Sequence, residues 1–160
     1  IILYDFCESL EIPVMVYGHS TDYYDGKDSV ELYSYAEFNG FDNDDKYRLM
    51  DISARGSNRD GAALRYVAEA LSKRPEAVKL LILVSDGQPA DPGYYGPAAE
   101  EDLRGIKQEY QRKGILFVAA AIGNDKQNIE RIYGDSFLDI TDLNQLPTKL
   151  TGVVKRHIRV

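Results

Sequence analysis

The chain has 160 residues, of which 44% are hydrophobic and 28% are charged, and its formal net charge at pH 7 is −7. This size fits one domain with a core of its own, and the composition is typical of a globular protein. The negative charge argues against a general nucleic-acid-binding protein, which needs cations to replace the counterions of the phosphates. No apolar run approaches the roughly 20 residues of a membrane-spanning helix, so no membrane partner is expected.

Cysteine and histidine are scarce. The single cysteine, Cys7, excludes an internal disulfide and a thiolate metal cluster, and it is expected to be a small core residue. His19 and His157 are too far apart in sequence to form a zinc motif. Because the sequence also shows no secretion signal, we predict a reducing, cytoplasmic location.

The first part of the chain is predicted to form a helix, a hairpin and a second helix. Apolar residues at helical spacing predict a helix over residues 1–10. Residues 14–19 and 29–35 are predicted to be strands, and the turn signal Asp25-Gly26 between them favours an antiparallel edge hairpin. The acidic run 42–45 leads into a short helix, and we expect these carboxylates to cap that helix rather than to form a site.

The rest of the chain alternates between helices and strands. The strands predicted at 79–86 and 115–122 are apolar almost throughout, as in strands that are covered on both faces. The alternation predicts parallel strands joined by right-handed crossovers. We therefore expect an α/β fold with a doubly wound, mostly parallel sheet, helices on both faces and an antiparallel edge strand. The remaining predicted elements are a strand at 136–140 and helices at 60–73, from Pro97, after Asp125 and from near Asp142.

The chain begins inside its first helix and without an initiator methionine. A helix that opens a doubly wound domain normally follows a strand, so we expect an N-terminally truncated fragment whose first strand is absent. A sheet without that strand would have an unpaired gap at its centre, so we expect either a homo-oligomer that exchanges strands or an altered strand order.

Short oxygen-bearing side chains occur in two loops that are expected at the carboxyl edge of the sheet, where open α/β sheets bind their ligands. Asn58 and Asp60 lie before and at the start of the helix at 60–73, and Asp86 ends the apolar strand at 79–86. Such side chains suit Mg²⁺ or Mn²⁺. The alternative is that Asn58 or Asp60 only caps the helix, and spacing alone leaves both interpretations open.

The same loops contain residues that suit partner recognition. We assign Ser57, Ser85, Tyr94 and Tyr95 to a partner-binding surface, since paired tyrosines are typical of recognition sites. The tyrosines can equally pack over the sheet edge. Ser85 lacks a histidine base and a nucleophile elbow, which disfavours a catalytic role. The chain has no P-loop, so we expect no ATP site of that kind.

Two motifs resemble those of a known family. The apolar strand with Ser85-Asp86-Gly87 resembles the third metal-site motif of von Willebrand factor type A (vWA) domains. Asn58-Arg59-Asp60-Gly61 resembles the second, in which threonine usually stands at the position of Asn58. The longer string from Ser85 to Asp91, followed by Tyr94-Tyr95, is similar to the C-terminal vWA domains of the cobaltochelatase subunit CobT and the nitric oxide reductase activation protein NorD. The first motif, Asp-x-Ser-x-Ser, is absent, which removes three oxygen ligands.

The resemblance implies one vWA-like domain over residues 1–160, with a metal-ion-dependent adhesion site (MIDAS). In that site a divalent cation, Mg²⁺ or Mn²⁺, is bound at the sheet edge, and a carboxylate of the partner completes its octahedral coordination. By position, Asn58 replaces the threonine, Asp86 is the distal aspartate and Asp60 is an additional acid. The resemblance also implies a MoxR-type AAA+ ATPase and its client protein as partners, with catalysis in the ATPase rather than in this chain.

Two other functions stay open. One is a metal-dependent hydrolase with Asp86 as base or ligand, although Arg59 is the single cationic side chain in the two edge loops. The other is a metal-free structural subunit in which Asn58 and Asp60 are only helix caps.

Overall fold

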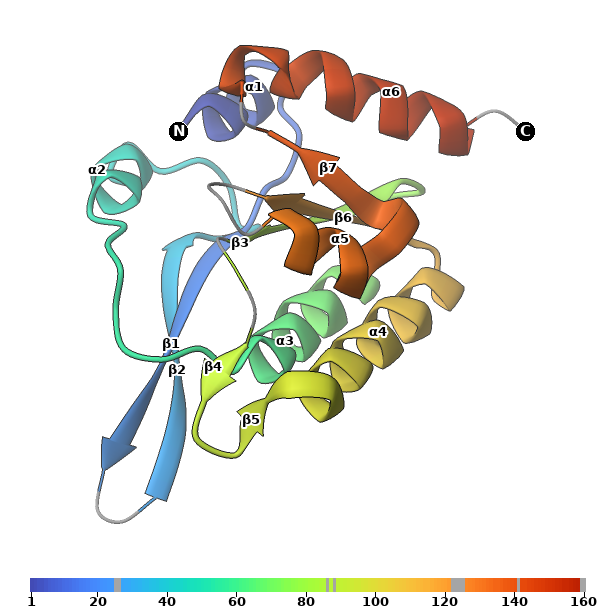
Figure 1. The fold of residues 1–160 in the computed structure, drawn as a ribbon. Coiled ribbons are helices and arrows are strands. Elements are labelled where there is room, and N and C mark those ends of the chain that lie inside the picture. The colour runs from blue at the N-terminus through green and yellow to red at the C-terminus, as the bar shows by residue number, and fades with distance from the viewer. Residues whose placement is uncertain (25–26, 86, 88, 122–125, 141, 159–160) are drawn as a thin grey trace. The chain divides into compact units, whose positions relative to one another are not determined.

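A computed structural model of the chain describes residues 1–24, 27–85, 87, 89–121, 126–140 and 142–158. They form two compact units, Ile1–Asn58 and Arg59–Val160, and each unit has strands of its own (Figure 1). The second unit contains a parallel sheet and the first an antiparallel hairpin, so the predicted α/β class is confirmed. Every helix in the described ranges is too short or too polar to traverse a lipid bilayer.

The first unit is a hairpin with two short helices. Its strands pair antiparallel from Val16 opposite Ala36 to Tyr24 opposite Lys27. The predicted hairpin is therefore confirmed, but both strands are longer than expected, because the polar and aromatic residues after His19 continue the ladder. The predicted Asp25-Gly26 turn lies outside the described residues. The elements are α1 (Ile2–Ser9), β1 (Val16–Tyr24), β2 (Lys27–Ala36) and α2 (Asp45–Met50).

A buried carboxylate lies beside the apolar core of the first unit. Asp45 is 2% exposed, and its Oδ2 accepts a hydrogen bond of 2.5 Å from the hydroxyl of the core residue Tyr4. The guanidinium of Arg48 forms ion pairs with Asp45 and with Asp42. The N-cap of α2 is Asp44, which makes no side-chain capping bond. The acidic run does cap the start of the helix as expected, because Oδ1 of Asp42 accepts a hydrogen bond of 3.0 Å from the amide of Asp44, and Oδ2 of Asp45 accepts one of 3.2 Å from the amide of Asp42. The prediction missed that Asp45 is also buried and bonded to Tyr4, which is distant in sequence.

These contacts predict a dependence of stability on pH. The hydrogen bond from Arg48 lowers the pKa of Asp42. Burial raises the pKa of Asp45, but hydrogen bonds from Tyr4 and Arg48 outweigh it, so this pKa is also lowered. A carboxyl group whose pKa is lower in the folded than in the unfolded chain stabilises the fold at pH values above its unfolded-state pKa, which is about 3.9. This stabilisation is lost as the pH falls through the pKa of the folded state.

We therefore expect the urea midpoint of the chain to fall between about pH 5 and pH 3, and to fall less in Arg48→Met. The measurement is urea unfolding followed by circular dichroism at several pH values. Equal pH dependence in the two proteins would mean that Arg48 does not set the pKa values of these carboxyl groups.

The second unit is built around a parallel sheet with the strand order β3-β6-β7. Strand β3 pairs with β6 from Lys79 opposite Ile115 to Ser85 opposite Ala121, and β6 then pairs with β7. Helices α3 and α4 pack against each other beneath the sheet in Figure 1, and α6 lies on its other side. The elements are α3 (Asp60–Ser72), β3 (Lys79–Ser85), β4 (Ala90–Asp91), β5 (Tyr94–Tyr95), α4 (Gly96–Arg112), β6 (Ile115–Ala121), α5 (Lys126–Tyr133), β7 (Phe137–Asp139) and α6 (Leu146–Ile158), with 3-10 turns at Gly134–Ser136 and Leu143–Gln145.

The core of the second unit is formed by its sheet and by the apolar faces of its helices. Helix α6 buries Leu146, Leu150 and Val153, which share a helix face. The loop after β3 also contains the two-residue strands β4 and β5. Their turn places Pro92 before Gly93, whose φ of 83° is the left-handed conformation that glycine tolerates best. The apolar residues that helices α3, α4 and α5 bury in this core are Ala63, Leu64, Ala68, Leu71, Ala99, Leu103, Ile106, Tyr110, Ile129, Ile132 and Tyr133.

Candidate functional site

The start of α3 and the end of β3 lie at the same edge of the parallel sheet. The short segment 73–78 joins the helix to the strand, and the two elements pack against each other. The helix must therefore run antiparallel to the strand. Asp60, the first residue of α3, is consequently placed at the edge where β3 ends with Ser85.

Asp60 is a buried carboxylate, with 5% of the residue exposed. The N-cap of α3 is Arg59, whose side chain makes no capping hydrogen bond, so neither Asn58 nor Asp60 occupies the N-cap position. Asp60 instead lies in the first helical turn, where the helix dipole stabilises a negative charge. Asn58 is half-buried, two residues earlier in the sequence, as the last residue of the first unit.

The carboxylate of Asp60 lies in surroundings that contain two tyrosine hydroxyls. Tyr133 is 1% exposed, and its hydroxyl has no hydrogen-bond partner among the described residues. Burial and then the negative charge of Asp60 raise the pKa of Tyr133. Burial, a hydrogen bond to Asp102 and the charge of Asp60 likewise raise the pKa of Tyr94. Asp60 thus places a negative charge near the rings of Tyr133 and Tyr94 within the second unit.

Tyr94 and Tyr95 have different surroundings. The hydroxyl of Tyr94 donates a hydrogen bond of 2.7 Å to Oδ2 of Asp102, and the residue is half-buried against the start of α3. A Cβ atom at Gly61 would lie 2.3 Å from the Tyr94 hydroxyl oxygen and 2.5 Å from Oδ2 of Asp102, so this contact requires glycine. Tyr95 is 68% exposed. A role of either tyrosine in partner binding stays a prediction.

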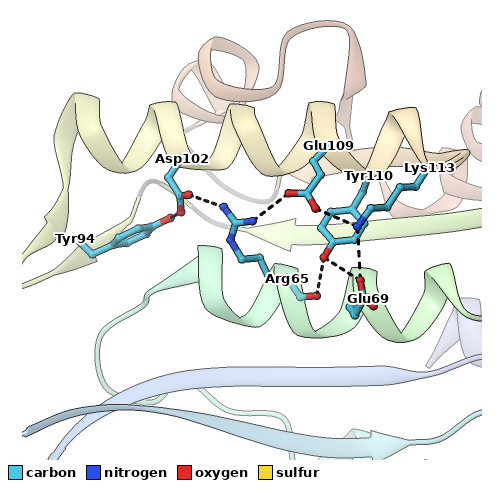
Figure 2. A network of polar contacts seen from close by, with 7 residues as sticks. All are labelled: Arg65, Glu69, Tyr94, Asp102, Glu109, Tyr110 and Lys113. Carbon is cyan, nitrogen blue, oxygen red and sulfur yellow. Dashed lines mark hydrogen bonds and ion pairs between the residues drawn. The ribbon is translucent and has the colours of Figure 1, made fainter.

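A chain of polar contacts fixes Asp102 between α3 and α4 (Figure 2). The guanidinium of Arg65 bridges Oδ1 of Asp102, at 2.9 Å, and Oε2 of Glu109, at 3.1 Å. The ammonium of Lys113 is 3.0 Å from Oε1 of Glu109. Because Tyr94 also bonds to Asp102, the loop that carries the tyrosines is connected to both helices.

Arg59 makes a second connection to this loop, and the sequence does not predict it. Its Nε donates to Oδ1 of Asp91 at 2.5 Å, and its Nη2 donates to the carbonyl oxygen of Pro92 at 2.7 Å. Asp91 is itself buried. The sequence contained one indication of this ion pair, since Arg59 and Asp91 carry opposite charges in two loops that were expected at the same edge of the sheet. Charge alone does not identify which acid pairs with Arg59.

The two serines assigned to the partner-binding surface lie in different units. Ser85 closes a turn at the end of β3, where its Oγ is 3.3 Å from both the nitrogen and the carbonyl oxygen of Gly87. The carbonyl oxygen of Ser57 accepts a hydrogen bond of 2.8 Å from the amide of Thr21 within the first unit. Asp86, the predicted ligand after Ser85, lies outside the described residues. Within the described ranges, no three His, Cys, Asp or Glu side chains gather as a metal cluster.

Comparison with known proteins identifies the family. The family model for the von Willebrand factor type A domain matches residues 24–150. The chain belongs to this family. Its vWA domain is 29% identical over 114 residues to Uncharacterized protein YojO of Bacillus subtilis, a match that covers 68% of the chain and 18% of that protein. It is 27% identical over 113 residues to Protein NorD of Brucella suis, covering 69% of the chain and 18% of NorD.

A third relative is Uncharacterized protein PA0525 of Pseudomonas aeruginosa, which is 28% identical over 120 residues, or 73% of this vWA domain and 20% of that protein. The chain thus spans about a fifth of the length of the curated relatives it matches. No solved structure matches the chain. The predicted resemblance to NorD-like vWA domains is confirmed.

Proposed function

We propose that this vWA domain is a protein-recognition module that holds Mg²⁺ or Mn²⁺ at the edge formed by the start of α3 and the end of β3. The proposed ligands are Asp60 and Asp86, which both belong to the second unit. The main support for the proposal is that Asp60 is buried at the edge of the parallel sheet where β3 ends.

The residues fit a hard divalent cation. Carboxylate and amide oxygens on short side chains are the ligands that Mg²⁺ and Mn²⁺ prefer. Burying a carboxylate costs free energy that a neighbouring positive charge offsets. When bound, the cation would supply a coordination position for a carboxylate oxygen of the partner. The exposed ring of Tyr95 and the hydroxyl of Ser85 would contact the partner beside it.

The proposed partners are a MoxR-type AAA+ ATPase and its client metalloenzyme. Support comes from membership of the vWA family and from the relatives named NorD. In this proposal the ATPase carries out hydrolysis and the vWA domain supplies recognition, so no residue of this chain is assigned a catalytic role.

Calorimetric titration with MgCl₂ tests the metal site. We expect Asp86→Ala and Asp60→Asn to weaken Mg²⁺ binding at least about tenfold, since each removes a proposed ligand. Asp135→Asn is the matched control, because it removes a carboxylate from an exposed position that pairs with Lys107. Equal binding by the wild type and Asp86→Ala would remove the site assignment.

A further inference from the structure

A groove in the first unit combines apolar walls with carboxylates. Its volume is about 170 Å³, and its apolar lining includes Val14, Phe38 and Phe41. A cavity of about 150 Å³ is large enough for a benzene molecule, so this groove has room for one apolar side chain of a partner. Glu11, Glu37 and Asp45 also line it.

The three carboxylates differ in how they are held. Glu37 accepts hydrogen bonds from the hydroxyls of Tyr17 and Ser34, and Asp45 is buried with its partners. Glu11 is exposed, and within the described chain no hydrogen bond or ion pair is formed by its carboxylate. Glu11 is therefore the acid at this groove that is best placed to meet an incoming cation.

The backbone of Glu11 is strained. Its φ is 55°, and it is the one residue other than glycine with a positive φ in the described part of the chain. It follows the C-cap of α1, a place where glycine usually adopts this conformation without a steric cost. A carboxylate that occupies such a position despite its cost suggests a use for the side chain.

The charge of the chain indicates the chemistry of the occupant. Residues 1–58 contain 12 Asp and Glu against 4 Lys and Arg, whereas residues 59–160 contain 14 against 15. The net negative charge is thus carried by the unit that contains the groove. Such a surface attracts and orients a positively charged partner.

We propose that this groove binds a basic segment of a partner protein. An apolar side chain of the segment contacts Val14, Phe38 and Phe41, and a neighbouring lysine or arginine pairs with Glu11. This interaction is separate from the metal edge, so it needs no divalent cation and does not depend on the proposed function.

The probe is a fluorescein-labelled peptide, Lys-Arg-Leu-Lys-Arg, whose binding to the whole chain is measured by fluorescence anisotropy in EDTA. We expect Glu11→Lys to weaken binding about tenfold or more, and Glu31→Lys, the same charge change at an exposed position of β2, to weaken it less than about threefold. Replacing leucine by serine in the peptide should also weaken binding about tenfold or more, because the free energy gained by burying the leucine side chain is lost.

Glu11→Gly provides an independent variant, because it removes the carboxylate and relieves the strain. We expect it to bind the peptide about tenfold more weakly while its thermal midpoint rises. Absence of binding in EDTA, equal effects of Glu11→Lys and Glu31→Lys, or equal affinity for the serine peptide would each overturn the proposal.

Discussion

Gly61→Ala is expected to lower the free energy of unfolding by about 2–3 kcal/mol, although alanine is the better helix former. The reason is steric. The added methyl group would lie well inside contact distance of the Tyr94 hydroxyl and of Asp102. Neither group can move away cheaply, because they bond to each other and Asp102 also pairs with Arg65 (Figure 2).

The measurement is urea unfolding followed by circular dichroism. Gly105→Ala is the matched control, because Gly105 lies within α4 and a Cβ there meets nothing within 4 Å, so stability should rise by up to about 1 kcal/mol. Adding Tyr94→Phe to Gly61→Ala should restore part of the loss, since it removes the hydroxyl oxygen. A Gly61→Ala protein as stable as the wild type would contradict this description of the start of α3.

Ala120→Leu is expected to lower the free energy of unfolding by about 3 kcal/mol. Ala120 has no exposed surface, and its neighbours in β6, Ala119 and Ala121, are equally buried. Strand β6 lies between β3 and β7 and contacts α3, α4 and α5. A larger side chain at its centre would have to displace these elements, because protein interiors are close-packed.

Ala62→Leu is the control for this substitution, because Ala62 is exposed on α3 and should tolerate leucine within about 0.5 kcal/mol. Both proteins would be unfolded in urea under the same conditions. An Ala120→Leu protein that loses no more stability than Ala62→Leu would show that β6 has free space beside it.

The fold was largely predictable because its signals are local. The apolar runs that became β3 and β6 are long and uninterrupted, and the helices between them repeat apolar residues at helical spacing. The ladder between β4 and β5 was not predicted, because two paired residues leave no periodic pattern. The burial of Asp45 was also missed, since it depends on Tyr4, a residue distant in sequence.

The candidate site was predictable only in outline. The alternation of strands and helices placed Asp60 and the end of β3 at one edge, and the structure of the second unit has this arrangement. The partners of the side chains at that edge were not predictable. The bonds from Arg59 to Asp91 and from Tyr94 to Asp102 depend on how the loop after β3 folds back, which no local pattern specifies.

The most direct test of the metal site uses Mn²⁺, whose unpaired electrons broaden the NMR signals of nearby amides. At substoichiometric Mn²⁺, we predict that the amide signals of residues 59–62 and 85–87 broaden first and that Asp60→Asn abolishes this selectivity. The first unit has the larger excess of acidic residues, so unspecific binding would favour it. Broadening that begins at residues 42–45 instead would contradict a metal site at the edge of the parallel sheet.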